Sequence, residues 1–140
     1  MPIRYLSFTE GDYDEAMALW RRCEGVALGR ADAREHVAAY LRRNPGFSFV
    51  ARGEDGALAG AVLCGHDGRR GYLHHLAVEP GCRGRGIGRA LAARALDAVR
   101  AAGLEKCHLF VLAGNAAGRR FWARAGWRER TDLVIMTADL

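Results

Sequence analysis

Residues 83–89, which read RGRGIGR, combine two residue types that suit anion binding. Glycine lets a bulky anion approach the main-chain N–H groups, and arginine pairs with phosphate oxygens. The residues of the two types are Arg83, Arg85 and Arg89, and Gly84, Gly86 and Gly88. No carboxylate follows Glu79 before residue 96, so nothing in this stretch repels an anion. The chemistry that it predicts is phosphate binding, and in particular pyrophosphate binding.

The position of this stretch strengthens the prediction. It connects an expected strand at residues 71–78 to an expected helix from about residue 86 to residue 102. The first N–H groups of a helix have no partners within the helix and carry roughly half a positive charge. A phosphate group can therefore bind at the start of this helix.

Two other phosphate motifs do not fit. A Walker loop requires lysine and then serine or threonine after its second glycine, whereas Ile87 and Gly88 follow Gly86. A dinucleotide fingerprint would need its third glycine at Arg89 or Leu91.

A second candidate is the histidine pair His74 and His75 in the strand YLHHLAV. Imidazole is the side chain whose ordinary pKa best suits proton transfer near neutral pH. Because adjacent strand residues face opposite ways, at most one of the two is expected to face a reaction site. The alternative of equal weight is that both are ordinary strand histidines, one packed and one solvated.

The elements that must position these groups form one continuous domain over residues 1–140. Helices are expected at 13–23, 32–43, 86–102 and 116–125, the last capped by Asn115. Strands are expected at 3–8, 47–52, 57–66, 71–78, 106–112, 127–130 (WRER) and 132–138 (DLVIMTA). The apolar strand 106–112 is expected at a buried central position. The order β-αα-βββ-α-β-α-ββ predicts an α/β (α+β) fold, with a mixed, mostly antiparallel central sheet and helices on both faces.

Composition narrows the class of protein. Half of the residues are hydrophobic and the formal net charge is +5, which favours a globular protein with an anionic partner. No apolar run reaches the ~20 residues of a membrane span, and no signal peptide is recognisable. The four cysteines are scattered, so we expect reduced thiols, a cytoplasmic location and no metal site.

The sequence resembles the GNAT N-acetyltransferase superfamily at two motifs. LAVEPGCRGRGIGRAL (76–91) is similar to the family's phosphate-loop signature at Arg83, Gly86 and Gly88, and NAAGRRFWARAGW (115–127) is similar to its second motif at Asn115, Gly118, Gly126 and Trp127. The resemblance covers residues 72–127. The two motifs occur in the family's order and at its expected separation.

The resemblance implies acetyl-CoA as co-substrate, without a metal. Its pyrophosphate would lie on residues 83–89, Ile87 included, and its pantetheine arm beside Ala77 and Val78. A bulge near Leu76 would direct the N–H of that residue at the thioester carbonyl. His74 becomes the first choice for the base, because many relatives carry glutamate there, and His75 the second. Further contacts with acetyl-CoA would come from Asn115, Gly118 and Trp122.

Trp122 departs from the family pattern, which often has a tyrosine there that protonates the leaving thiolate. An indole N–H donates a hydrogen bond but gives up no proton near neutral pH. Since a thiol of pKa near ~8.5 can leave as the thiolate, the departure does not exclude turnover. Residues 21–23 (RRC), Arg30, Asp32 and Arg34 could select an acidic substrate, but a solvated helix face is the plainer interpretation. Trp20 and Tyr40 are expected in the core rather than in the cleft.

The function that we expect is transfer of an acetyl group from acetyl-CoA to a primary amine of a small-molecule or amino-acid-like acceptor. Attack would be direct, within a ternary complex. Alternatives are a protein N-terminal or lysine acetyltransferase, a CoA-binding module without turnover, and an arginine-rich nucleic-acid binder. Nucleic acid and membrane are not the expected partners, and a homodimer stays open.

Overall fold

The structure is a computed structural model that describes residues 2–140. The chain divides into two compact units, one ending at Phe110 and the other running from Val111 to Leu140.

The first unit is built on a five-stranded sheet in the order β1-β2-β3-β4-β5. The strands are β1 (Arg4–Ser7), β2 (Phe49–Arg52), β3 (Leu58–His66), β4 (Gly71–Val78) and β5 (Cys107–Leu109). Strands β1 to β4 pair antiparallel, and β5 pairs parallel with β4. The sheet is therefore mixed and mostly antiparallel, as the sequence predicts.

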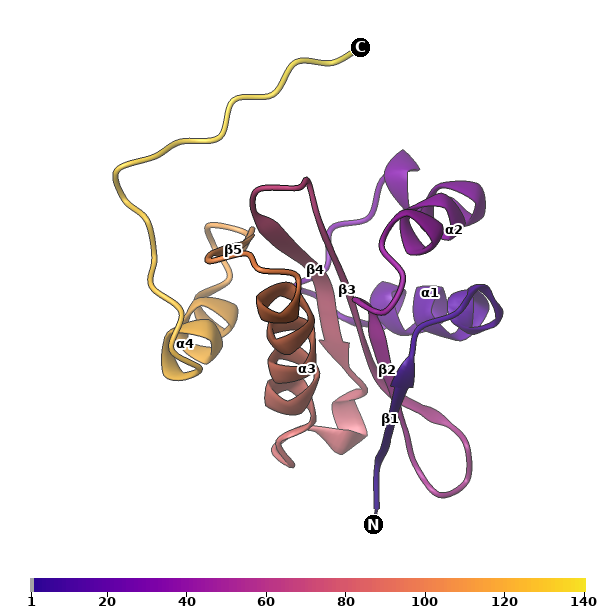
Figure 1. Ribbon diagram of the computed structural model, residues 1–140. Coiled ribbons are helices and arrows are strands. Elements are labelled where there is room, and N and C mark those ends of the chain that lie inside the picture. Colours follow the sequence, from indigo (N-terminus) through magenta and orange to yellow (C-terminus); the bar gives the residue numbers. More distant parts are fainter. Residues whose placement is uncertain (1) are drawn as a thin grey trace. The chain divides into compact units, whose positions relative to one another are not determined.

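Helices cover both faces of this sheet (Figure 1). They are α1 (Tyr13–Arg22), α2 (Arg34–Arg43) and α3 (Ile87–Ala101), with short 3-10 turns η1 (Glu10–Asp12), η2 (Arg30–Asp32) and η3 (Pro80–Cys82). A Cβ added to Gly65 of β3 would meet Tyr40 of α2, whereas one added to Gly60 would meet Leu91 of α3. Helices α1 and α2 thus lie on one face and α3 on the other.

The spacing of apolar residues explains these contacts. The residues of α1 that the structure buries are Ala16, Met17, Leu19 and Trp20, which follow helical periodicity. They join a core cluster with apolar residues of β2, β3 and β4, among them Val50, Ala61, Leu63 and Ala77. On the opposite face, Ile87, Leu91, Ala95 and Val99 of α3 are buried, on the face that the sequence predicts. None of the helices among residues 2–140 is long and apolar enough to cross a membrane.

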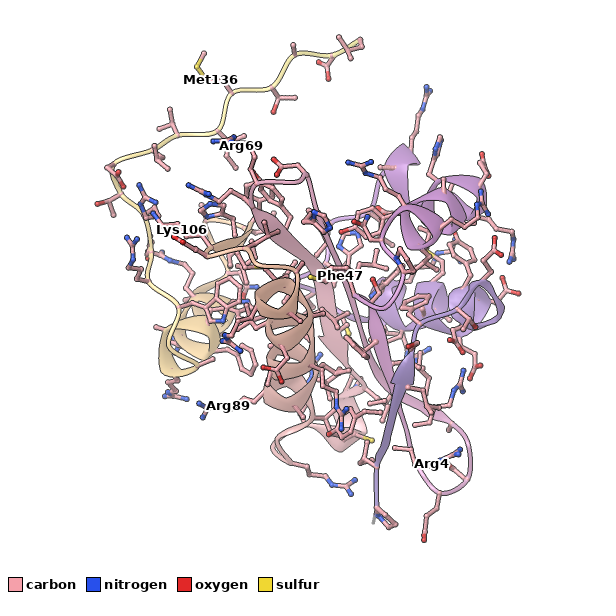
Figure 2. All side chains as sticks on the ribbon, viewed as in Figure 1. Arg4, Phe47, Arg69, Arg89, Lys106 and Met136 are labelled. Atoms are coloured by element: carbon pink, nitrogen blue, oxygen red, sulfur yellow. The ribbon has the colours of Figure 1, made fainter. Side chains whose placement is uncertain are left out.

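The second unit contains α4 (Ala116–Arg124) and an extended C-terminal segment. The expected strands at 127–130 and 132–138 are not formed. A strand requires a ladder partner, and the run Leu133–Met136 has no strand beside it within the described second unit. Its side chains are exposed, Val134 by 86% and Met136, labelled in Figure 2, by 90%.

The expected strand 106–112 is also shorter than predicted and lies elsewhere in the sheet. It forms only as β5, and it is the last strand of the sheet rather than a buried central one. Because the two following strands do not form, no strand covers its outer edge in residues 2–140. Phe110, expected within the strand, is 60% exposed.

Candidate functional site

Strand β4 contains a bulge at the two residues that follow His74. His75 and Leu76 together oppose the single residue Val62 of β3. His75 has φ of 52°, in the left-handed region, where a histidine is less unfavourable than most residues that carry a Cβ. Bulges re-aim side chains and main-chain groups, and they are common beside active sites.

The bulge places both imidazoles on the face that α1 and α2 cover. The ring of His75 lies 5.1 Å from the ring of Trp20 in α1, and the ring of His74 lies 6.2 Å from that of Tyr40 in α2. The expectation that the two histidines face opposite sides is therefore wrong here. The extra residue in the strand interrupts the alternation on which that expectation depends.

A buried carboxylate holds the ring of His75. His75 Nε2 lies 2.7 Å from Asp32 Oδ1 at the end of η2, and the two side chains are only 18% and 11% exposed. The other oxygen of Asp32, Oδ2, accepts the Gly29 N–H at 3.0 Å. An imidazole nitrogen that contacts a carboxylate donates a proton to it, so in the neutral ring Nδ1 keeps a free lone pair.

The main chain at the bulge is fixed from the same side. The indole Nε1 of Trp20, which is 1% exposed, donates to the carbonyl oxygen of His75 at 3.0 Å. In a trans peptide the carbonyl and the following N–H point in opposite directions. Since the carbonyl of His75 points toward α1, the N–H of Leu76 points away from α1.

His74 lies near two aromatic rings. The ring centroids of Tyr40 and Phe110 are 6.2 and 6.3 Å from that of His74. Burial lowers the pKa of His74 below its ordinary value, the proximity of His75 lowers it further, and Asp32 partly opposes both effects. The lowered pKa favours the neutral form of His74.

Beyond the bulge, one edge of β4 has no strand beside it. β5 pairs only with Gly71–Leu73, so Leu76–Val78 have no β5 partner among residues 2–140. The N–H of Glu79 donates to the carbonyl of Ala59 in β3 at 2.8 Å. Because antiparallel ladders alternate, the N–H of Val78 is directed to the opposite, uncovered edge. Ala77, opposite Ala61, lies within the ladder and is buried.

This edge leads through η3 into the predicted phosphate loop. Gly84 and Gly86 have φ of 78° and 79°, so glycine is required there by conformation. A Cβ at either position would meet no atom within 4 Å, which leaves open space beside the loop. Gly86 is the N-cap of α3, whose first turn has neither a side-chain cap nor an acidic residue. The start of α3 therefore retains the helix N-terminal charge that favours an anion.

Arginines stand on either side of the loop glycines in the sequence. Arg83 Nε donates to the carbonyl of Val78 at 3.2 Å and its Nη2 lies 3.6 Å from Cys23 Sγ, which ties the loop to the end of β4. Arg89, labelled in Figure 2, extends from the first turn of α3.

The second unit carries the second motif. The side chain of Asn115 caps α4 by accepting the Gly118 N–H at 2.9 Å, as the sequence predicts. A Cβ on Gly118 would lie 2.5 Å from Asn115 Nδ2, which explains a small residue three positions after the asparagine. Trp122 packs against Phe121 and Trp127 in an aromatic cluster of this unit. The roles of Asn115, Gly118 and Trp122 toward a ligand stay predictions.

Two residues of the site were missed by sequence reasoning. Asp32 was assigned to a solvated helix face but is 8% exposed, and Trp20 was assigned to the core alone but also binds the His75 main chain. Asp32 lies 43 residues before His75, and no local pattern connects them.

Comparisons with known proteins agree with this arrangement. Residues 13–127 match the model of the Acetyltransferase (GNAT) family. An acetyltransferase of Pectobacterium atrosepticum is 34% identical over 110 residues, 79% of this chain and 77% of that protein. One of Sodalis glossinidius is 34% identical over 129 residues, covering 92% and 89%. The structure of PaiA N-acetyltransferase from Thermoplasma acidophilum in complex with coenzyme A is similar, with a TM-score of 0.80, 19% identity and 94% of each chain covered. The chain thus belongs to the acetyltransferase (GNAT) family and is an acyltransferase.

Proposed function

We propose that the protein transfers an acetyl group from acetyl-CoA to a primary amine of a small-molecule or amino-acid-like acceptor, by direct attack in a ternary complex. One observation carries the proposal: the bulge at His75 and Leu76 lies beside the uncovered edge of β4. That edge runs directly into the glycine-rich loop at the start of α3. A donor for the thioester oxygen, an edge for the pantetheine and a cradle for the pyrophosphate follow one another along the chain.

The residues present fit acetyl-CoA. The pyrophosphate would bind at residues 83–89, where Gly84 and Gly86 leave open space beside the start of α3. The N–H of Val78 would donate to a pantetheine carbonyl along the edge that β5 leaves uncovered, while the Val78 carbonyl accepts from Arg83. Both contacts rest on main-chain groups, so they depend on the conformation of β4 and the loop more than on any one side chain.

The main chain also supports stabilisation of the developing negative charge. As the amine attacks, the thioester oxygen gains charge and needs a fixed donor. The N–H of Leu76 would serve, because the Trp20 indole holds the preceding carbonyl in the opposite direction. A single such donor is worth roughly 3–4 kcal/mol in enzymes where it has been removed.

Proton transfer is the task of the imidazoles. An alkylamine with a pKa near ~10 is mostly protonated at neutral pH, so a base increases the attacking fraction. His74 and His75 lie on the same face beside the bulge, and both stay candidates at this level. The thiolate would leave without a tyrosine, since Trp122 supplies no proton.

The domain bounds, the location in the cell and the oligomeric state stay predictions. The family match extends across both units, which supports one N-acetyltransferase domain over residues 1–140. The four cysteines are free, and a cytoplasmic location stays a prediction. A homodimer stays open.

An acceptor screen tests the proposal. Release of CoA thiol from acetyl-CoA would be followed with glycine, spermidine, kanamycin and a short peptide with a free N-terminus. We expect thiol release above the acceptor-free rate with at least one of the first three amines. Release with the peptide alone would indicate a protein acetyltransferase. Acetyl-CoA binding without release for any amine would indicate a CoA-binding module and contradict the proposal.

A further inference from the structure

We propose that His75 accepts the proton of the amine acceptor at Nδ1, and that Asp32 is the residue that positions His75 for this task. This inference rests on the proposed function, since it assigns the base within the same site. It also reverses the preference for His74 that the sequence resemblance gave. The observations that carry it are the contact between Nε2 and the Asp32 carboxylate and the contrasting packing of the two histidines.

Hydrogen bonds fix the geometry of Asp32 and His75. Asp32 is held by the Gly29 N–H at Oδ2, so Oδ1 is left to His75. Because a carboxylate only accepts hydrogen bonds, the His75 proton must be on Nε2 in the neutral ring. The tautomer is thereby set, and the nitrogen with the free lone pair is Nδ1.

The backbone of His75 adopts an unfavourable conformation. Its φ of 52° is the only positive value among the residues other than glycine in the described chain. Such a conformation is strained and persists only where surrounding contacts impose it. Here the contacts are the Asp32 carboxylate on the ring and the Trp20 indole on the carbonyl. The same two contacts therefore fix the imidazole and the adjacent Leu76 N–H.

Acetyl transfer moves one proton from the amine through His75 to the thiolate. The acceptor enters this step as the neutral amine. Its lone pair forms the new C–N bond to the acetyl carbon, and the C–S bond breaks with its electron pair on the CoA sulfur. The proton leaves the nitrogen for His75 Nδ1, and the imidazolium is stabilised by a charge-assisted hydrogen bond to Asp32. The ring then returns the proton through solvent to the thiolate. The products are the acetylamine and the CoA thiol, and His75 is again neutral.

His74 suits this task less well. It has no hydrogen bond to a carboxylate among the contacts of residues 2–140, and its neighbours include the aromatic rings of Tyr40 and Phe110. The rings of His74 and His75 lie 6.5 Å apart, so a positive charge on His75 disfavours a second charge on His74. His74 thus serves as a neutral packing neighbour.

The test combines a spectroscopic and a kinetic measurement. Long-range ¹H–¹⁵N correlation spectra of the ¹⁵N-histidine-labelled protein report which ring nitrogen carries the proton. The His75→Asn variant identifies the His75 signals among the five histidines, and asparagine tolerates the left-handed conformation. We expect a proton on Nε2 and none on Nδ1 in the wild-type protein, and loss of this single tautomer in Asp32→Asn.

The kinetic arm uses thiol release from acetyl-CoA with the amines of the acceptor screen. Asp32→Asn is expected to lower kcat by roughly 10²–10⁴-fold, the range for loss of general-base catalysis, with little change in KM. Asp14→Asn is the matched control, because it removes the same charge from a side chain that is 79% exposed and pairs with Arg34. This control should keep the wild-type tautomer and kcat.

The outcomes separate the two proposals. A proton on Nδ1 of His75 in the wild-type protein would overturn the assignment without any variant. Wild-type kcat in Asp32→Asn would overturn it as well, while the proposed function would stand. If the wild-type protein released no thiol with any of the four amines, the proposed function would fail, and the role of His75 with it.

Discussion

Replacing Gly86 with glutamate would place a carboxylate at the start of α3, where the pyrophosphate is expected. Gly86 has φ of 79°, and a Cβ there would meet nothing within 4 Å. A residue with a Cβ in this conformation costs about 1–2 kcal/mol, so the variant should fold with a modest loss of stability. Gly86→Gln carries the same strain and nearly the same volume without the charge, and it is the matched control.

The charge sets the size of the expected effect. Two like charges about 4 Å apart repel by ~1 kcal/mol in bulk water and by ~4 kcal/mol at an effective dielectric constant of about 20. Since each 1.4 kcal/mol is tenfold in affinity, Gly86→Glu should bind acetyl-CoA about 5- to 700-fold more weakly than Gly86→Gln. The difference should shrink as salt is added, because the loop is open to solvent.

Isothermal titration calorimetry of acetyl-CoA gives the two affinities, and thermal denaturation of both variants confirms that the fold is retained. Equal affinities for Gly86→Glu and Gly86→Gln at low salt would refute the assignment of the pyrophosphate to this loop. A difference at low salt that vanished in high salt would support it.

Two further perturbations address the bulge and its surroundings. Trp20→Phe removes the donor to the His75 carbonyl, so urea denaturation should show a loss of about 1–3 kcal/mol in unfolding free energy. The kcat of this variant for thiol release should also fall. An unchanged kcat would contradict the proposed orientation of the Leu76 N–H. His74→Phe tests the effect of burial on the pKa of His74, which Asp32 only partly opposes. Because that pKa is lower in the folded protein, the unfolded chain binds the proton more readily, and stability should fall as the pH drops below about 6.5. The melting temperature of His74→Phe should therefore decline less than that of the wild type from about pH 7.5 to 5.5, and equal declines would contradict the shift.

Local patterns predicted the parts of the fold that local chemistry determines. The strand 71–78 was predicted with the bounds that β4 has, because turn residues flank an apolar, β-prone run. The start of α3 and its phosphate loop were predicted because glycine and arginine mark them directly. The cap of α4 by Asn115 follows from the same kind of short-range rule.

Contacts between residues far apart in the sequence determined the features that local patterns could not predict. The contact between Asp32 and His75 joins η2 to β4, and its existence depends on how α1 and α2 pack on the sheet. The bulge was expected only from the family resemblance. A short apolar run does not show whether its strand holds one residue more than the strand with which it pairs. The strand composition of 132–138 was misleading for a related reason: strand propensity gives no ladder without a neighbouring strand.

The rate of thiol release after removal of the Leu76 N–H tests directly whether the bulge is the site of acetyl transfer. Incorporating the α-hydroxy acid analogue of leucine at Leu76 replaces that amide with an ester and keeps the side chain. We expect kcat to fall about 10²–10³-fold, the effect of losing one oxyanion donor, with nearly unchanged affinity for acetyl-CoA. The same replacement at Ala77, which lies within the β3–β4 ladder, should lower stability more than kcat. A wild-type kcat for the Leu76 ester would contradict the account of the bulge as the site of acetyl transfer.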